Sequence, residues 1–152
     1  MKTGTGPEGT DPADPPVAAH ATTPPSVVSS LSYAIDADGQ LVTITGNYTD
    51  AAGWRTLLTA IAADPRYRRG SGFIRDLRAA EHPVDATTVI GIVTVVREFW
   101  DVLGVRRAAM VTRLAIDIPA IVAEALAQDQ RVALRSFTSY DEAVAWVLAD
   151  AR

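Results

Sequence analysis

Seven polar or charged side chains stand where they could bind a ligand or take part in a reaction. They lie at or just after the ends of predicted strands or surround the start of a predicted helix: Asp76, Arg78, Asp85, Thr87, Thr88, Thr112 and Arg113. In open α/β sheets, ligands bind in the crevice at the carboxyl ends of the strands, and these residues are predicted to gather at that edge. We therefore predict a ligand- or partner-binding site there.

Thr87 and Thr88 belong to the first turn of the predicted helix, shortly after Asp85. Free backbone N–H groups and the positive dipole end of a helix favour an anion or a phosphoryl group, so both threonines are candidate phospho-acceptors. The alternative is that Asp85 simply caps the helix and that the threonines are ordinary first-turn residues.

Asp76, at the end of a predicted central strand, also has two interpretations. It is either a functional carboxylate or a structural one that bonds the following loop or pairs with Arg78 or Arg113. Arg75 precedes it inside a strand that is expected to be buried, so its guanidinium needs a partner or an edge position.

The sequence offers few residues for catalysis. There is no cysteine, and the only histidines are His20 and His82, so neither a zinc cage nor a histidine-based triad can be built from these residue types. A hydrolase would have to rest on carboxylates such as Asp76 and Asp85, which would need to converge with Arg113 in one cleft. We predict a non-enzymatic protein without metal or cofactor and keep the hydrolase as an alternative.

The composition of the chain limits the classes of partner that we expect. The 152-residue chain carries a formal net charge of -4 and has a sequence pI of about 5.0, and its basic run is confined to residues 66–69, so nucleic acid is not an expected partner. No apolar stretch reaches the roughly 20 residues that span a bilayer. The absence of cysteine and of an apolar leader-like start predicts a cytoplasmic protein.

The chain divides into a tail and one domain. Residues 1–30 contain six of the nine prolines together with many Gly, Ser and Thr residues, which predicts a disordered segment. From residue 31 onward, short β-type runs alternate with amphipathic helices in the order ββαβαβαβα. The expected strands are residues 31–35, 41–45, 73–77, 108–112 and 131–137, and the expected helices begin after Thr49 or Asp50, Asp85, Asp117 and Ser139. Helical crossovers between strands imply a five-stranded, mostly parallel mixed sheet with four helices.

The apolar residues of each helix predict a buried face. For the third helix this face is Ile118, Ile121, Val122, Ala125 and Leu126, and for the last it is Ala143, Val144, Val147 and Leu148. The second helix, around residues 86–103, has a surplus, because Ile90, Val95 and Val102 fall partly outside its main stripe. We interpret that surplus as a partner surface, with a homodimer as the preferred use.

Three short sequence segments, in this order and spacing, resemble those of the SpoIIAA-like, STAS-related family, and the resemblance covers residues 31–152. They are Ala63-Asp64-Pro65-Arg66-Tyr67-Arg68, then Arg75-Asp76-Leu77-Arg78, then Ser136-Phe137 with Asp141-Glu142-Ala143-Val144-Ala145-Trp146-Val147. The resemblance implies a STAS-type fold in a non-enzymatic module that binds protein partners, small ligands or lipids. In the classical members a serine at the start of the helix after the third strand is phosphorylated. Ala86 stands at that position here, so the sequence departs from the phosphorylation motif.

Two functions follow as expectations. The first is a STAS-like regulatory or protein-interaction module that recognises a partner, or a second copy of itself, through the second helix and the strand-end loops. The alternative is a module for a small anionic or lipid-like ligand held between that helix and the sheet, with Thr87, Thr88 and Arg113 near its head group. A cavity lined by Val89, Val93 and Val111 would favour this alternative.

Overall fold

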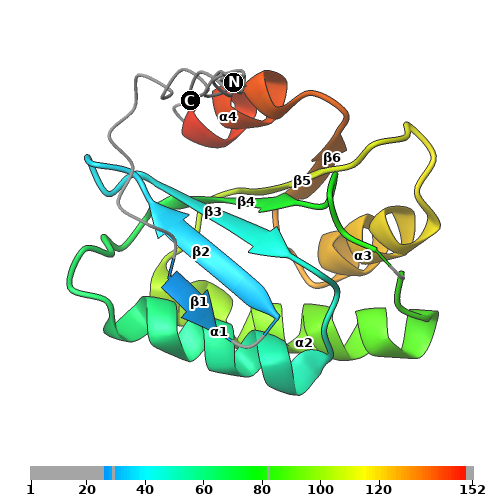
Figure 1. Ribbon diagram of the computed structural model, residues 1–152, viewed down its shortest axis with the longest axis horizontal. Coiled ribbons are helices and arrows are strands. Elements are labelled where there is room, and N and C mark those ends of the chain that lie inside the picture. The colour runs from blue at the N-terminus through cyan, green and yellow to red at the C-terminus, as the bar shows by residue number, and fades with distance from the viewer. Residues whose placement is uncertain (1–25, 29, 82, 150–152) are drawn as a thin grey trace, which may run out of the picture.

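Six strands form one mixed sheet, and neighbours in the sheet are also neighbours in the sequence (Figure 1). The computed structural model describes residues 26–28, 30–81 and 83–149. The strands are β1 (Ser26–Val28), β2 (Leu31–Ile35), β3 (Leu41–Gly46), β4 (Gly72–Asp76), β5 (Ala108–Val111) and β6 (Leu134–Phe137). The first three pair antiparallel, and β3, β4, β5 and β6 pair parallel. The predicted α/β class and mixed sheet are therefore confirmed.

The sheet has one strand more than the sequence predicted. The five expected strands are β2 to β6, and β1 adds to the edge of β2 with Val28 opposite Leu31. Residues 26–28 were assigned to a disordered segment, and that part of the prediction is wrong because these residues gain strand pairing that their composition does not reveal. Residues 1–25 and 29 of that segment lie outside the described residues. Its last residue, Ser30, lies in the turn before β2.

Four helices cover the sheet unequally. They are α1 (Ala51–Ala63), α2 (Ala86–Leu103), α3 (Ile118–Asp129) and α4 (Tyr140–Leu148). Figure 1 shows α1, α2 and α3 on one face and α4 on the other, with α2 contacting both α1 and α3. Because successive side chains of a strand point to opposite faces, β4 directs Phe73 and Arg75 toward α2 and Ile74 toward α4.

The predicted helix starts are confirmed by their caps. Asp50, Asp85 and Asp117 each accept a hydrogen bond from the backbone N–H three residues later, and Ser139 accepts one from Glu142. Each cap satisfies one of the N–H groups that a helix start leaves free. The end of α2 at Gly104 is confirmed as well, since this residue adopts the left-handed conformation with φ of 64°.

The predicted buried face of α3 is wrong in part. The buried residues of α3 are Ala120, Ala123 and Ala127, while Ile118 and Ile121 are 65% and 50% exposed. Val122 and Leu126 of the predicted face are half-buried and pack against the core. Hydropathy ranks isoleucine above alanine and so placed Ile118 and Ile121 in the buried face. The structure places the alanines inward, where α3 packs against α2 and β6.

Three smaller predictions also need correction. Val95 of α2, assigned to a surplus surface, is buried in the cluster that α1 and α2 share, although Ile90 and Val102 are exposed as expected. Leu148 of α4, predicted to be buried, is 39% exposed. The last strand starts at Leu134 rather than at residue 131, because Arg131 adopts a positive φ of 59° that a strand cannot contain.

Candidate ligand-binding site

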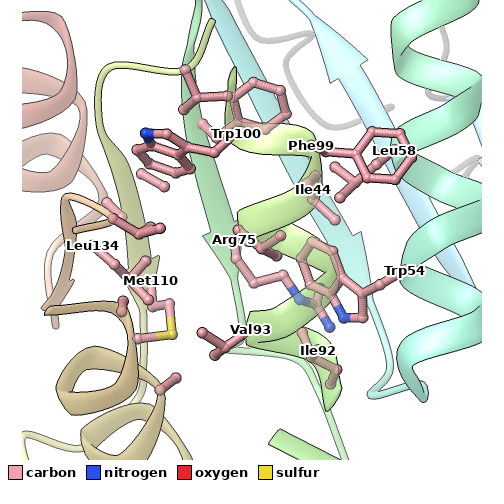
Figure 2. Close-up of a pocket in the computed structure, with 18 of the residues that line it drawn as sticks. Ile44, Trp54, Leu58, Arg75, Ile92, Val93, Phe99, Trp100, Met110 and Leu134 are labelled. Atoms are coloured by element: carbon pink, nitrogen blue, oxygen red, sulfur yellow. The ribbon is translucent and has the colours of Figure 1, made fainter. Parts of the chain in front are cut away.

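An apolar cavity of about 100 Å³ lies between α2 and the sheet (Figure 2). Apart from Arg75, its lining is apolar or aromatic and comes from four strands and the three helices on that face. The main lining residues are Ile44, Trp54, Leu58, Phe73, Val93, Val96, Phe99, Trp100, Met110 and Leu134. The alanines Ala123 and Ala127 of α3 complete the wall, and their short side chains leave part of this space unfilled.

A second cavity of about 70 Å³ lies toward the ends of the strands, where α2 and α3 begin. Val89 from the second turn of α2 and Ala120 from the first turn of α3 line it, together with Tyr48 and Leu77. Six residues line both cavities: Trp54, Arg75, Ile92, Val93, Met110 and Ala123. The two spaces are therefore adjacent, with Arg75 where they meet.

Among the described residues, Arg75 is the one charged residue that lines either cavity. Its side chain is 7% exposed, and Figure 2 shows it extending from β4 toward the part of the cavity that Trp54 and Ile92 line. Burial lowers the pKa of its guanidinium to about 10, against the opposing effects of Tyr48 and Asp76, so the group stays cationic at neutral pH.

Backbone carbonyls hold this guanidinium. Nη2 donates to the carbonyl oxygens of Gly46 and Asn47, each at 3.0 Å, and Nη1 lies 3.4 Å from the carbonyl oxygen of Asp76. No carboxylate of the described residues forms an ion pair with it. The sequence indicated that the Arg75 guanidinium needs a partner or an edge position. The carbonyls of Gly46 and Asn47 are partners of this kind, and their bonds join β4 to the chain that leaves β3.

Tyr48 supplies the other titratable side chain in the lining of these cavities. It is half-buried in the wall of the second cavity, and burial, followed by the charge of Asp117, raises the pKa of its phenol. Its hydroxyl therefore stays protonated at neutral pH and is able to donate a hydrogen bond.

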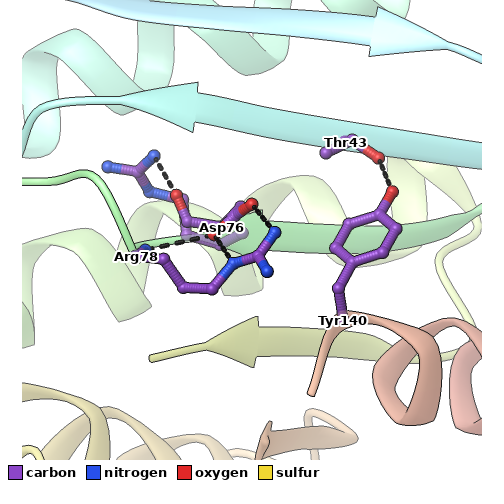
Figure 3. Close-up of polar contacts among 5 residues, drawn as sticks. Thr43, Asp76, Arg78 and Tyr140 are labelled. Carbon is purple, nitrogen blue, oxygen red and sulfur yellow. Dashed lines mark hydrogen bonds and ion pairs between the residues drawn. The ribbon is translucent and has the colours of Figure 1, made fainter. Parts of the chain in front are cut away.

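Asp76 and Arg78 do not belong to this site. Asp76 points toward the α4 face, where Arg78 donates to both of its carboxylate oxygens at 2.9 and 2.7 Å and also through its backbone N–H (Figure 3). The Arg78 guanidinium lies 5.5 Å from the centre of the Tyr140 ring, and the Tyr140 hydroxyl lies 2.9 Å from Oγ1 of Thr43. The contacts match the structural interpretation of Asp76, and they lower the pKa of its carboxyl through the hydrogen bond from Arg78.

The predicted residues around the start of α2 are dispersed. Asp85 caps the helix by accepting from the Thr88 backbone N–H at 2.8 Å, and this bond lowers the pKa of its carboxyl. Thr87 is exposed and Thr88 is half-buried, and neither lines the cavities. Their role as phospho-acceptors stays a prediction.

Thr112 and Arg113 follow β5. Thr112 is buried and its hydroxyl donates to the Leu114 carbonyl at 2.8 Å, so it shapes the turn, whereas Arg113 is exposed. Asp76, Asp85 and Arg113 are all absent from the lining of both cavities, so these cavities do not supply the common cleft that the carboxylate hydrolase requires.

On the sequence alone, a cavity lined by Val89, Val93 and Val111 would favour a small ligand. The structure meets this condition for two of the three residues. Val93 lines both cavities and Val89 lines the second, but Val111 faces α4 on the opposite side of the sheet. Sequence reasoning missed most of the lining because apolar residues that border a void have the same pattern as residues that fill a core. The signal that could have found the site is Arg75, a charged residue within a buried strand.

The basic run is explained by local contacts. Arg66 pairs with Asp64 at 2.6 Å, Tyr67 donates to the Leu103 carbonyl, and Arg69 donates to the Val102 carbonyl at 2.6 Å. The last two bonds satisfy carbonyls at the end of α2, where a cation is also favoured by the helix dipole.

Two negative observations apply to residues 26–28, 30–81 and 83–149. No helix there is long and apolar enough to cross a bilayer. No group of three or more histidine, cysteine or acidic side chains is placed to hold a metal ion.

Comparisons with known proteins add no family assignment. No family model matches the sequence, and no curated protein matches it significantly.

Proposed function

We propose that this protein is a non-enzymatic binding module that holds a small, mostly apolar molecule between α2 and the sheet. The observation that carries the proposal is the pair of adjacent apolar cavities that meet at Arg75. The resemblance to SpoIIAA-like, STAS-related proteins agrees with this function, and membership of that family is part of the proposal.

Packing energetics support a ligand. Protein interiors are close-packed, and unfilled space costs about 24 cal/mol per Å³, so the larger cavity of about 100 Å³ costs roughly 2 kcal/mol. A ligand that fills this space restores the lost dispersion contacts. An engineered cavity of about 150 Å³ binds benzene. Each cavity here is smaller than that, but the two together are larger.

The test is an NMR titration of the ¹⁵N-labelled protein with 1-hexanol and benzene. We expect saturable shifts that centre on Val93 and Met110, which line both cavities. Ala108→Ile places a β-branched side chain at a strand position that lines the larger cavity, so it should abolish these shifts without loss of stability. Ala145→Val, on the exposed side of α4, is the matched control. Absence of saturable binding to the parent protein would refute the proposal.

A protein-interaction module is the second candidate, and a different observation favours it. Leu114, Ile116, Ile118 and Ile121 are all at least half exposed, in the loop after β5 and the first turn of α3. Contiguous exposed apolar surface marks interaction sites. The surface predicted on α2 has weaker support, because Ile90 and Val102 lie three turns apart with the Arg97–Asp101 ion pair between them.

Sedimentation velocity over a wide concentration range tests this candidate and the homodimer together. Association that Ile116→Ser weakens would place an interface at the loop, whereas association that Val102→Ser weakens would place it on α2. A monomer at every concentration would count against self-association through either surface.

A further inference from the structure

We propose that the ligand is a small monocarboxylate whose anionic group pairs with Arg75 while its apolar part fills the cavity under α2. This inference rests on the binding function proposed above and specifies the chemical class of the ligand.

The first argument is the donor count of Arg75. A guanidinium has five N–H donors, and three acceptors are present: the carbonyls of Gly46, Asn47 and Asp76. The Nε–H group and one N–H of Nη1 therefore have no acceptor among the described residues. An N–H group of a charged side chain that has no protein acceptor can donate to a ligand that reaches it.

The second argument is the missing counter-charge. None of the described residues that line the two cavities is acidic. The nearest carboxyl along the chain, Asp76, is directed to the opposite face and bound at both oxygens by Arg78. A buried cation with only carbonyl partners retains a strong attraction for an anion that reaches it, because the surroundings screen charge weakly.

The third argument is size and placement. Arg75 lies where the two cavities meet, so an anion beside it leaves apolar space on the side of Trp100 and Phe99. On the other side, the second turn of α2 and the first turn of α3 border the second cavity, and Tyr48 offers a hydroxyl there. The carboxylates of Asp85 and Asp117 already cap these two helix starts, so the contacts for the ligand's anionic group come from Arg75 and Tyr48. The volumes suit a carboxylate with an apolar part of about five to eight carbon atoms.

Matched pairs of probes test the inference on the full chain at pH 7. Hexanoate is compared with 1-hexanol, and phenylacetate with 2-phenylethanol, by calorimetry or NMR titration. Each acid should bind about tenfold or more tightly than its alcohol, as a charge-assisted hydrogen bond in a buried site predicts. In the unaltered protein, the Arg75 Nε–H resonance should shift on addition of the acid and not of the alcohol.

Arg75→Met should remove the preference for the acid while leaving the affinity for the alcohol within about twofold. Arg78→Met is the matched control, because it removes a guanidinium that pairs with Asp76 on the opposite face. If Arg75→Met does not fold, the Nε–H resonance of the unaltered protein still decides the question.

The outcomes separate the two proposals. Equal affinity for acid and alcohol, with an unmoved Arg75 resonance, would overturn the carboxylate inference and leave the apolar binding function standing. Binding of neither acid nor alcohol would overturn both.

Discussion

The hydroxyl of Tyr33 on β2 donates a 2.8 Å hydrogen bond to the carboxylate of Asp64, the residue that ends α1. Asp64 also pairs with Arg66, and the hydrogen bond from Arg66 is the main reason that the pKa of its carboxyl lies far below the ordinary 3.8. These contacts fix the end of α1 against the antiparallel part of the sheet.

A group whose pKa is lowered by folding stabilises the protein above its unfolded pKa and loses that contribution as pH falls. Asp64 should therefore contribute fully at neutral pH and progressively less below about pH 4. Asp64→Asn should lower the free energy of unfolding by about 1–2 kcal/mol at pH 7 and by much less near pH 2. Urea denaturation across this range measures the effect.

Asp38→Asn is the control for this titration, because Asp38 is an exposed residue of the β2–β3 turn. It should leave the pH dependence nearly unchanged. If Asp64→Asn and Asp38→Asn had the same pH profile, the proposed contribution of Asp64 would be wrong.

Gly72, at the start of β4, should tolerate no side chain. A Cβ atom there would overlap Cγ1 of Val147 on α4. Gly72→Ala should lower the free energy of unfolding by about 1–3 kcal/mol, as overpacking does. Adding Val147→Ala removes the overlapping methyl group, so a double-mutant cycle should give a coupling of about 1 kcal/mol or more. Simple additivity would contradict the proposed clash.

Two helical isoleucines should respond differently to truncation. Ile61 of α1 is fully buried, whereas Ile121 of α3 is half exposed. Ile61→Ala should cost about 2–5 kcal/mol, and Ile121→Ala should cost about 1 kcal/mol or less. A large loss for Ile121→Ala, measured at protein concentrations too low for self-association, would show that the α3 face predicted from hydropathy is the buried one after all.

Asp76 provides a check on the catalytic alternative. If its role is to hold Arg78 and the loop after β4, Asp76→Asn should lower the free energy of unfolding by about 1 kcal/mol. Its effect on the affinity for 1-hexanol should stay within about twofold, since Asp76 lines neither cavity. A much larger change in affinity would show that Asp76 contributes to ligand binding.

The sequence by itself determined the order of the five main strands and four helices and the positions where the helices begin. These features depend on short-range physics: Asp50, Asp85, Asp117 and Ser139 cap the helices that follow them, and Gly104 supplies the left-handed residue that ends α2. Alternation and helical periodicity record which segments are strands or helices, because both are properties of neighbouring residues.

Only the tertiary structure decided which face of each element is buried and where space is left unfilled. Ala120 and Ala123 turn inward while Ile118 and Ile121 turn outward, because packing of α3 against α2 and β6 outweighs the hydropathy of single residues. Asp76 and Arg75 are adjacent in sequence but lie on opposite faces of the sheet, as the pleat of a strand requires. A cavity arises from side chains brought together from four strands and three helices, so the periodicity of apolar residues could not reveal it.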